Sequence, residues 1–344
     1  MSSIGELLEA AKIKELKRLI EGSREVVITC HLTPDGDAVG STLALAHLLR
    51  MLGHTARVVT PDTPPKNLMG LPGAADIMPF SRYEAILRPI IERADLICCL
   101  DFNALHRIDR LAPLIAEAKG AKVLIDHHLE PEDFADVTIS HPEMSSTCIL
   151  LYRLICDMGW KRRINRRIGE CIYTGMMTDT GNFTYNSCHP YLYEVIAHLV
   201  SLGVDKDRIY NEVCNSNTVN RLRLNGYALA EKMQVYADHR CALISLTRDE
   251  LNRYHYERGD TEALVNKPLS VPELVYSIFL REEPDYIKVS MRSRGEFPVN
   301  LICAENFGGG GHLNAAGGEY RGTMEQCINV IETIMPQYDK FLPK

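Results

Sequence analysis

The segment VVITCHLTPDGDAVG at residues 26–40 contains the transition that decides the fold. Its first five residues are almost wholly apolar, which is typical of a parallel strand whose sheet is covered by helices on both faces. Pro34 and Gly36 then favour a tight turn, and a helical pattern of apolar residues begins near Ala38. The order of strand, polar turn and helix predicts the first unit of a doubly wound α/β domain.

Two further apolar runs resemble the first, at residues 96–100 (LICCL) and 123–125 (VLI), and each is followed by an aspartate. Helical patterns lie between or after these strands, at residues 38–52, 113–118, 147–158 and 168–177. Strands that alternate with helices predict a doubly wound, mostly parallel sheet over residues 1–187.

The sequence changes in character after residue 187. Helical patterns lead into alternating strands and a last helix, at residues 191–204, 219–232, 235–246, 274–280, 286–291 and 324–335. We therefore predict a helical connector over residues 188–218 and a second, smaller α+β domain over residues 219–344.

Composition excludes several classes of protein. The 344 residues are 24% charged and 46% hydrophobic, with a formal net charge of −7, so no overall basic field attracts long duplex nucleic acid or a membrane surface. The eleven cysteines form no C-x-x-C motif, and no apolar run approaches a membrane span of about 18 residues. The chain is expected to be cytoplasmic, and a homodimer is compatible with it.

Acidic and histidine residues follow each predicted strand. Because the carboxyl ends of parallel strands share one edge of a sheet, we expect these side chains to converge there. Taken singly, most have an ordinary explanation, such as a helix N-cap or a turn. The residues concerned are His31, Asp35 and Asp37 after the first strand, Asp101 after the second, Asp126, His127 and His128 after the third, and Asp179, where a helical pattern gives way to a glycine turn.

Charge balance indicates what this cluster binds. Four carboxylates carry about four negative charges, which two divalent cations would neutralise and which would otherwise repel one another. Mixed histidine and aspartate ligands favour Mn²⁺, with Mg²⁺, Co²⁺ or Fe²⁺ as alternatives. Two-metal centres of this kind activate water for in-line displacement at phosphorus. The four carboxylates are those of Asp35, Asp37, Asp101 and Asp179.

A glycine cluster, FGGGGHLNAAG at residues 307–317, is the second candidate site. Glycines let backbone N–H groups approach an anion without obstruction, although many glycine-rich turns are only flexible. His312 follows the run, and Arg292 and Arg294 end the preceding strand, which favours a cradle for a phosphate or a terminal carboxylate. The basic run KRRINRR at residues 161–167 is interpreted as a solvated helix face.

Together these motifs resemble the DHH phosphoesterase superfamily. The matching elements are H-x-x-P-D-x-D-A-x-G at residues 31–40, the strand-end Asp101, the D-H-H triplet at 126–128 and G-x-x-x-D-T-G at 175–181. The glycine cluster resembles the signature G-G-G-H-x-x-A-A-G of the DHH-associated C-terminal domain. The most similar subfamily is that of the two-domain nano-RNases and pAp phosphatases.

The resemblance implies a role for each residue. One metal ion would be held by His31, Asp35 and Asp101, and the other by Asp37, Asp101, His127 and Asp179, with Asp101 bridging. Asp126 would orient a liganding imidazole, and His128 would face the scissile phosphate. The substrate would be gripped by Arg292, Gly310, Gly311 and His312.

The sequence thus predicts a metal-dependent phosphoesterase that cuts short oligoribonucleotides to mononucleotides, or pAp-like 3′,5′-bisphosphates, with water activated by two metal ions. Two alternatives stay open at this point. One is a phosphodiesterase of linear or cyclic dinucleotides, and the other is a catalytically silent nucleotide-binding sensor.

Overall fold

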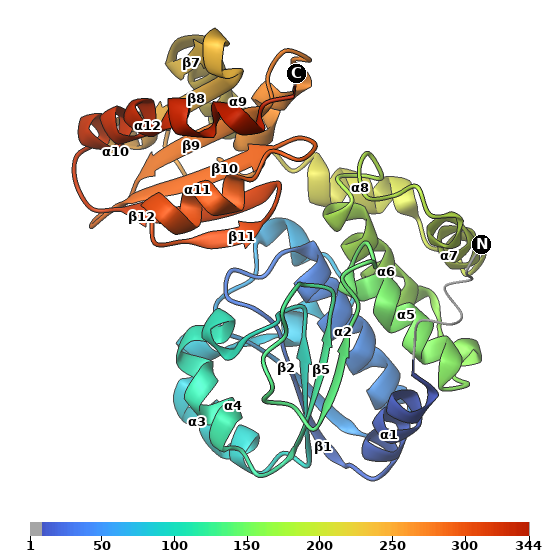
Figure 1. The fold of residues 1–344 in the computed structure, drawn as a ribbon. Helices are drawn as coiled ribbons and strands as arrows, with labels where there is room; N and C mark the ends of the chain where they lie inside the picture. The colour runs from blue at the N-terminus through green and yellow to red at the C-terminus, as the bar shows by residue number, and fades with distance from the viewer. Residues whose placement is uncertain (1–8, 344) are drawn as a thin grey trace. The chain divides into compact units, whose positions relative to one another are not determined.

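The computed structural model describes residues 9–343, and the chain divides into two compact units, Met1–Ser216 and Asn217–Lys344. Figure 1 shows the elements of both units. The first unit contains, in chain order, α1 (Ala10–Glu21), β1 (Glu25–Thr29), α2 (Gly36–Met51), β2 (Thr55–Thr60), β3 (Met78–Pro79), α3 (Phe80–Glu92), β4 (Leu96–Leu100), α4 (Ala112–Glu117), β5 (Ala121–Asp126), β6 (Val137–Ser140), α5 (Thr147–Asp157), α6 (Arg166–Asp179), α7 (Pro190–Ser201) and α8 (Lys206–Cys214).

The described residues of the first unit form a six-stranded sheet in the order β3-β2-β1-β4-β5-β6. Every neighbouring pair of strands is parallel. The predicted α/β class with a doubly wound parallel sheet is therefore confirmed. The chain order of the strands reverses between β1 and β4, and ligands of open α/β sheets bind beyond the carboxyl ends of the strands at such a switch point.

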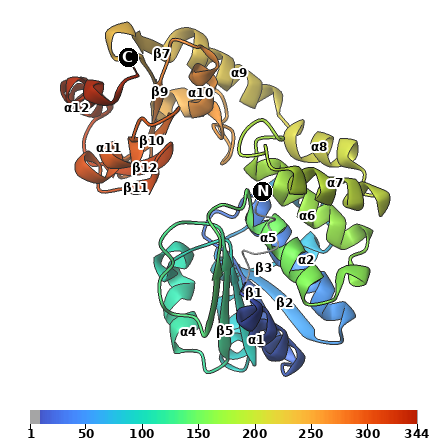
Figure 2. The same cartoon turned by 45° about the vertical axis from the view of Figure 1, so that its right-hand side comes forward.

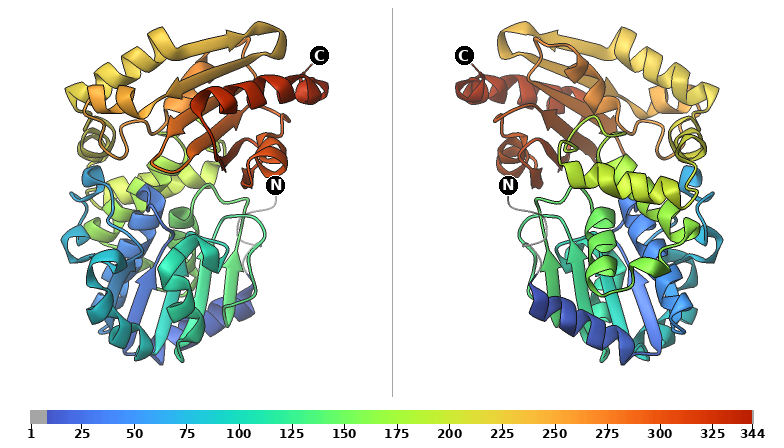
Figure 3. Two further views of the ribbon diagram at one scale, coloured as in Figure 1. Left: turned by 90° about the vertical axis from the view of Figure 1, so that its left-hand side faces the viewer. Right: turned by 90° about the vertical axis from the view of Figure 1, so that its right-hand side faces the viewer.

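Helices cover both faces of this sheet. Val26 and Ile28 of β1 pack in a core with α1, α2, α5 and α6, whereas Val27 packs in a second core with α3 and α4. Figure 1 shows these two helical layers on either side of the strands, and Figure 3 views the unit from each of the two sides. Double burial explains why the strands are nearly continuous apolar runs, and why the adjacent Cys98 and Cys99 are both fully buried on opposite faces.

The prediction missed strands β2, β3 and β6, which lie toward the edges of the sheet. Strand β2 reads TARVVT, with Arg57 paired to Glu25 at 2.7 Å, and β6 alternates buried and half-buried residues. Strand β3 contains only two residues. Strands at or next to the edge of a sheet need not be apolar on both faces, so these three do not form the continuous apolar runs that mark β1, β4 and β5.

The predicted connector differs from the structure. Residues as far as Ser216 group with the first unit, because the apolar face of α7 (Leu192, Val195 and Leu199) packs into the core that contains α6. The helices of the predicted connector thus belong to the first unit rather than standing apart from it. Figure 2 shows α7 and α8 from a second direction.

Two findings concern the chain as a whole. All eleven cysteines, each within residues 9–343, are free thiols. None of the helices in that range combines the length and the apolarity that crossing a bilayer requires.

The second unit is built on a mixed sheet. Its described strands pair in the order β11-β12-β10-β9-β8-β7, and only β8 and β9 are parallel. Helices α11 and α12 pack on one face, and α9 and α10 on the other. Its elements are α9 (Val219–Tyr227), β7 (Met233–Tyr236), β8 (Cys241–Leu246), α10 (Arg248–Arg253), β9 (Tyr276–Glu282), β10 (Ile287–Ser293), α11 (Val299–Asn306), β11 (Gly310–His312), β12 (Ala315–Tyr320) and α12 (Met324–Tyr338).

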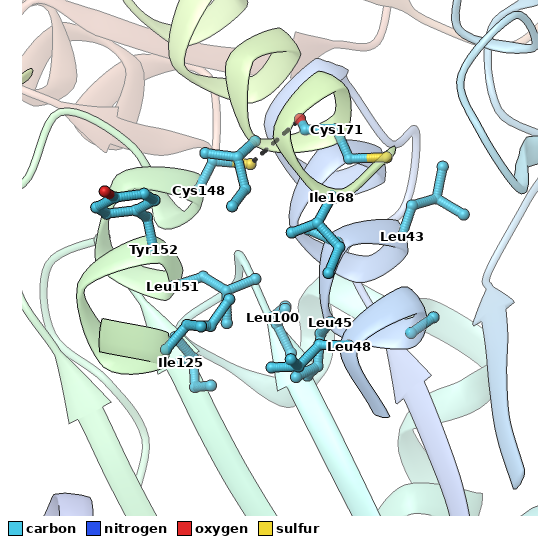
Figure 4. Close-up of a cluster of buried hydrophobic side chains, with 14 of the residues drawn as sticks. Leu43, Leu45, Leu48, Leu100, Ile125, Cys148, Leu151, Tyr152, Ile168 and Cys171 are labelled. Carbon is cyan, nitrogen blue, oxygen red and sulfur yellow. Dashed lines mark hydrogen bonds between the residues drawn. The ribbon is translucent and has the colours of Figure 1, made fainter. Parts of the chain in front are cut away.

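Helices α2 and α6 pack closely against each other. A Cβ atom on Gly40 would lie 2.5 Å from the carbonyl oxygen of Cys171 and 3.2 Å from the backbone nitrogen of Gly175, so only glycine fits there. Figure 4 shows Leu43, Leu45 and Leu48 of α2 among the buried side chains that continue this contact toward the strands. The two helices therefore pack with their backbones nearly touching.

We expect Gly40→Ala to destabilise the first unit by about 2 to 3 kcal/mol, because backbone atoms cannot move aside to admit the methyl group. The measurement is the free energy of unfolding of the full chain in denaturant. Gly70→Ala is the matched control, since its Cβ would meet only the flexible carboxylate of Glu212, at 3.2 Å. Equal stability of the two variants would contradict the contact described for Gly40.

Candidate metal centre

The predicted site residues converge at the carboxyl ends of three neighbouring strands. His31 follows β1, Asp101 follows β4, and Asp126 ends β5. Asp101 has a left-handed backbone conformation with φ of 64°, and its N–H donates to the carbonyl oxygen of Ile125. Such conformations in residues other than glycine are costly and cluster at functional sites.

Among the described residues, three groups of side chains bring possible metal ligands within 4.8 Å of one another. Two of these groups contain the ligands that the sequence predicted for the two metal ions, apart from Asp101 in the second. The groups are His31, Asp35 and Asp101; Asp37, His127 and Asp179; and Asp101, His127 and His128.

Asp101 lies between the two predicted sites. Its Oδ2 is 3.5 Å from Nε2 of His31, and its Oδ1 is 3.6 Å from Nε2 of His127. The carboxylate is 2% exposed, so one oxygen faces each site from a buried position. This is the arrangement that a ligand shared by two cations requires.

The remaining carboxylates are placed by helix ends. Asp35 is the N-cap of α2 and accepts hydrogen bonds from the N–H groups of Asp37 and Ala38, both at 3.0 Å. Asp179 is the last residue of α6, and its Oδ2 lies 3.2 Å from Nε2 of His127. A carboxylate at a helix C-terminus meets the negative end of the helix dipole, which favours a cation beside it.

The amino end of α5 is a part of the site that the sequence analysis missed. The N–H groups of Thr147 and Cys148 donate to Asp37 at 2.6 and 2.9 Å, and the Thr147 hydroxyl donates to Asp101 at 2.9 Å. The helix end therefore fixes two buried carboxylates. The available signal was the run Ser145-Ser146-Thr147 before an apolar helix, which predicts an N-cap but not what it faces.

The hydrogen bonds of two histidines direct their Nε2 atoms at the carboxylates. Nδ1 of His31 donates to the carbonyl of Leu32 at 2.8 Å, and Nδ1 of His127 donates to that of Met144 at 3.2 Å. With the proton assigned to Nδ1, each ring presents the lone pair of Nε2 to the cluster. Metal-binding histidines are held in this way by a partner on the opposite nitrogen.

Asp126 contacts a different histidine from the one expected. Its Oδ1 accepts from Nδ1 of His128 at 2.7 Å, and its Oδ2 accepts from the backbone N–H of His128 at 3.1 Å. The expectation that it orients a liganding imidazole is wrong for His127, whose Nδ1 bonds to a carbonyl. Because residues two apart on an extended chain lie on one face, the strand-end carboxylate meets His128 instead.

Burial and mutual repulsion shift the pKa values of the clustered carboxylates. Burial and the charge of Asp101 raise the pKa of Asp37 well above its usual range. Burial, with the charges of Asp101 and Asp35, raises that of Asp179 to about 9. Although burial acts in the opposite direction, interaction with His31 lowers the pKa of Asp101. The cluster therefore retains protons that bound cations would displace.

The donor set fits divalent cations. It combines imidazole Nε2 atoms with carboxylate oxygens, carries an excess of negative charge, and has its histidines and its central carboxylate fixed by other groups. Such nitrogen and oxygen ligands suit Mn²⁺ and related ions.

The second candidate site lies on the sheet of the second unit. Arg292 of β10 and His312 of β11 are both paired with Ala315 of β12, so the three residues form one row across adjacent strands. Residues directly opposite each other in antiparallel strands share a face. Arg292 and His312 therefore flank a small side chain on the same face.

Part of the glycine cluster is a strand rather than the turn that was expected. Gly310 and Gly311 belong to β11, the exposed edge of the sheet. A Cβ on Gly311 would lie 2.4 Å from the carbonyl oxygen of Ala315, whereas one on Gly310 would meet nothing within 4 Å. The close approach of β12 thus explains why residue 311 is glycine. At Gly310 the absence of a side chain leaves the backbone at the sheet edge accessible.

Lys288 is a further candidate for binding an anion at this second site, and the sequence did not predict it. It lies four residues before Arg292 on β10, where alternate residues face away from the helices α11 and α12. Partial burial and the positive charge of Arg281 lower the pKa of Lys288. Positively charged side chains therefore lie near one another on this face. The alternation in IKVSMRS could have indicated it, since residues two and four apart on a strand share a face.

Comparison with known proteins agrees with this site. The model of the DHH family N-terminal domain matches residues 25–176. The chain is 29% identical to the bifunctional oligoribonuclease and PAP phosphatase NrnA of Thermus thermophilus over 312 residues, which are 90% of this chain and 88% of that protein.

Solved structures match the whole chain. An exopolyphosphatase-related protein from Bacteroides fragilis has a TM-score of 0.95 and 47% identity over 99% of both chains. RecJ of Thermus thermophilus, in complex with Mn²⁺, shares the fold alone, with a TM-score of 0.55 and 14% identity over 98% of this chain and 56% of RecJ. The strand-end motifs, their convergence on one cluster and these matches lead to one conclusion: the chain belongs to the DHH family of phosphoesterases.

Proposed function

We propose that this protein is a two-metal phosphoesterase that hydrolyses short oligoribonucleotides and pAp-like bisphosphates. The observation that carries the proposal is the position of Asp101 between two groups of histidine and aspartate ligands. Its relative NrnA is named an oligoribonuclease and PAP phosphatase, which supports this substrate class.

The metal ligands divide into two sets. When bound, divalent cations supply an activated water and neutralise charge that develops on the phosphate. The first set is His31, Asp35 and Asp101, and the second is Asp37, Asp101, His127 and Asp179.

His128 has a separate part in the proposed reaction. Asp126 accepts a hydrogen bond from its Nδ1 and so orients the ring, to which we assign a contact with an oxygen of the scissile phosphate. The buried carboxylate fixes the ring, and a group held in place can stabilise negative charge that develops on the phosphate. His128 is therefore proposed as a substrate contact and not as a metal ligand.

The second unit is proposed to bind the far end of the substrate. Arg292 and His312 supply donors for a phosphate or a terminal group, and Gly310 and Gly311 leave the strand edge beside them open. Binding energy from a remote group positions the reacting phosphate, so this contact contributes to turnover as well as to affinity.

We expect wild-type protein to bind two divalent ions per chain, and Asp101→Asn to weaken both sites. Asparagine keeps the left-handed backbone but removes the shared charge. Mn²⁺ affinity and turnover should each fall more than about 100-fold, since replacing a residue that only holds a metal ligand in place already costs about 10- to 100-fold. Titration calorimetry and metal analysis are the measurements, with Asp157→Asn as the control. A single ion at saturation in wild type would overturn the two-metal assignment.

The tandem histidines should separate into two phenotypes. His127→Ala is expected to lose one of the two ions, whereas His128→Ala should retain both and lower turnover about 100-fold, the cost of one donor to a developing charge. Asp126→Asn should resemble His128→Ala with a smaller loss, because it acts through that ring. Equal loss of metal in His127→Ala and His128→Ala would show that their roles are assigned wrongly.

A Mn²⁺-supplemented hydrolysis panel tests the substrate class. RNAs of two to five residues and pAp should be cleaved far faster than a twenty-residue RNA, because two fixed anchors favour a short substrate. Arg292→Ala and His312→Ala should reduce that preference mainly by slowing the short substrates. The panel includes cyclic dinucleotides and, because one relative is described as exopolyphosphatase-related, inorganic tripolyphosphate. Faster cleavage of either, or processive digestion of long strands, would replace the proposed substrate.

A further inference from the structure

A concavity of about 820 Å³ lies on the first unit, where the carboxyl end of α2, the amino end of α6 and the helix α8 meet the turn that contains Asp76. None of the proposed metal ligands lines it. Its volume is within the range of about 300 to 1,000 Å³ that small-molecule sites occupy. Its charged lining residues are Arg50, Asp76, Arg166, Arg167, Glu170 and Arg208.

The lining is basic in an acidic chain. Four guanidinium groups outnumber two carboxylates, although the whole protein has a net charge of −7. Glu170 is 6% exposed and is shared by Arg166 at 2.9 Å and Arg208 at 2.7 Å. One buried carboxylate thus holds two guanidiniums at the wall of the concavity. Arg208 also pairs with Glu212 at 2.8 Å, so two carboxylates compensate Arg166 and Arg208.

The other two arginines are less compensated. Arg50 lies 3.6 Å from a carboxylate oxygen of Asp76, which is 67% exposed and therefore screened by water. Within residues 9–343 no ion pair involves Arg167, the second residue of α6. The positive end of the helix dipole adds to the charge at this point.

We propose that this concavity binds a small anion with two or more phosphate groups, either an inorganic polyphosphate or the phosphate tail of a nucleotide. Arginine forks recognise phosphate oxygens in pairs, and Arg167 with the weakly compensated Arg50 supplies positive charge in the lining for such a group. The N–H groups at the start of α6 add donors of the kind that bind phosphate. The basic run at residues 161–167 thus contributes Arg166 and Arg167 to a site rather than only to a solvated surface.

A long nucleic acid fits this lining less well. Continuous single strands are bound along grooves with aromatic side chains on which the bases stack, and the lining contains neither phenylalanine, tyrosine nor tryptophan. A bounded concavity with clustered arginines favours a compact ligand.

The proposed site is separate from the metal centre. Helix α6 has 14 residues and carries Arg166 at one end and Asp179 at the other, so its length of about 21 Å separates the two sites. Binding at the concavity should therefore not require metal.

The test is calorimetric titration of the full chain with two probes that resist hydrolysis, methylenediphosphonate and the β,γ-methylene analogue of ATP. Each titration is made with Mn²⁺ and again with a chelator, because binding at the metal centre requires Mn²⁺ and binding at the concavity does not. We expect binding of at least one probe in chelator. The stronger probe identifies the source of the phosphate groups, inorganic or nucleotide.

Variants assign the binding to the arginines. Arg167→Gln and Arg50→Gln should each weaken binding about tenfold or more, the cost of one charge-assisted contact. Arg162→Gln, in the same basic run but outside the lining, is the matched control and should bind as wild type does. Among residues 9–343 Arg167 has no ion-pair partner to lose, so its variant tests the site even if Arg50→Gln folds poorly.

Three results would overturn the proposal. They are the absence of binding at millimolar concentrations in chelator, equal affinity in Arg167→Gln and Arg162→Gln, and tighter binding of a twenty-residue RNA than of either probe. The last result would assign the basic surface to nucleic acid instead.

Discussion

Repulsion among carboxylates is the constraint on which the first unit depends. Asp37, Asp101 and Asp179 all approach His127 at the edge of the sheet, Asp101 also approaches His31, and burial leaves these carboxylates little contact with water. The amino end of α5 donates hydrogen bonds to Asp37, and the Nε2 atoms of His31 and His127 face the carboxylates. A doubly wound sheet suits such a cluster, because the switch point between β1 and β4 brings strand ends and helix ends together without a long loop.

Much of this could be predicted from the sequence. Strands β1, β4 and β5 are buried on both faces, so each is a short apolar run that ends in a polar residue, and parallel pairing then brings Asp101 and His127 together. The same logic fails for β2 and β6, since these strands near the two ends of the sheet carry polar or half-buried groups such as Arg57. It also fails for β11 and β12, where glycine and alanine give no alternation of apolar and polar side chains.

Contacts between distant segments were beyond the reach of sequence reasoning. Nothing near Thr147 shows that its helix points at Asp37, 110 residues earlier in the chain. The D-H-H triplet names a carboxylate and two imidazoles but not which of them pair, and the answer depends on a carbonyl group at Met144. Likewise, only the packing of α2 and α8 beside residues 161–167 shows that Arg166 and Arg167 line a concavity.

The backbone of Asp101 has an evolutionary consequence. Its left-handed conformation suits aspartate and asparagine better than longer side chains, whereas its place between two imidazoles requires a charge. Asparagine satisfies the first demand alone, and glutamate satisfies the second while adding a methylene to a site that is 2% exposed. Few single substitutions at this position keep both properties, so the position has little freedom to vary while the rest of the cluster is retained.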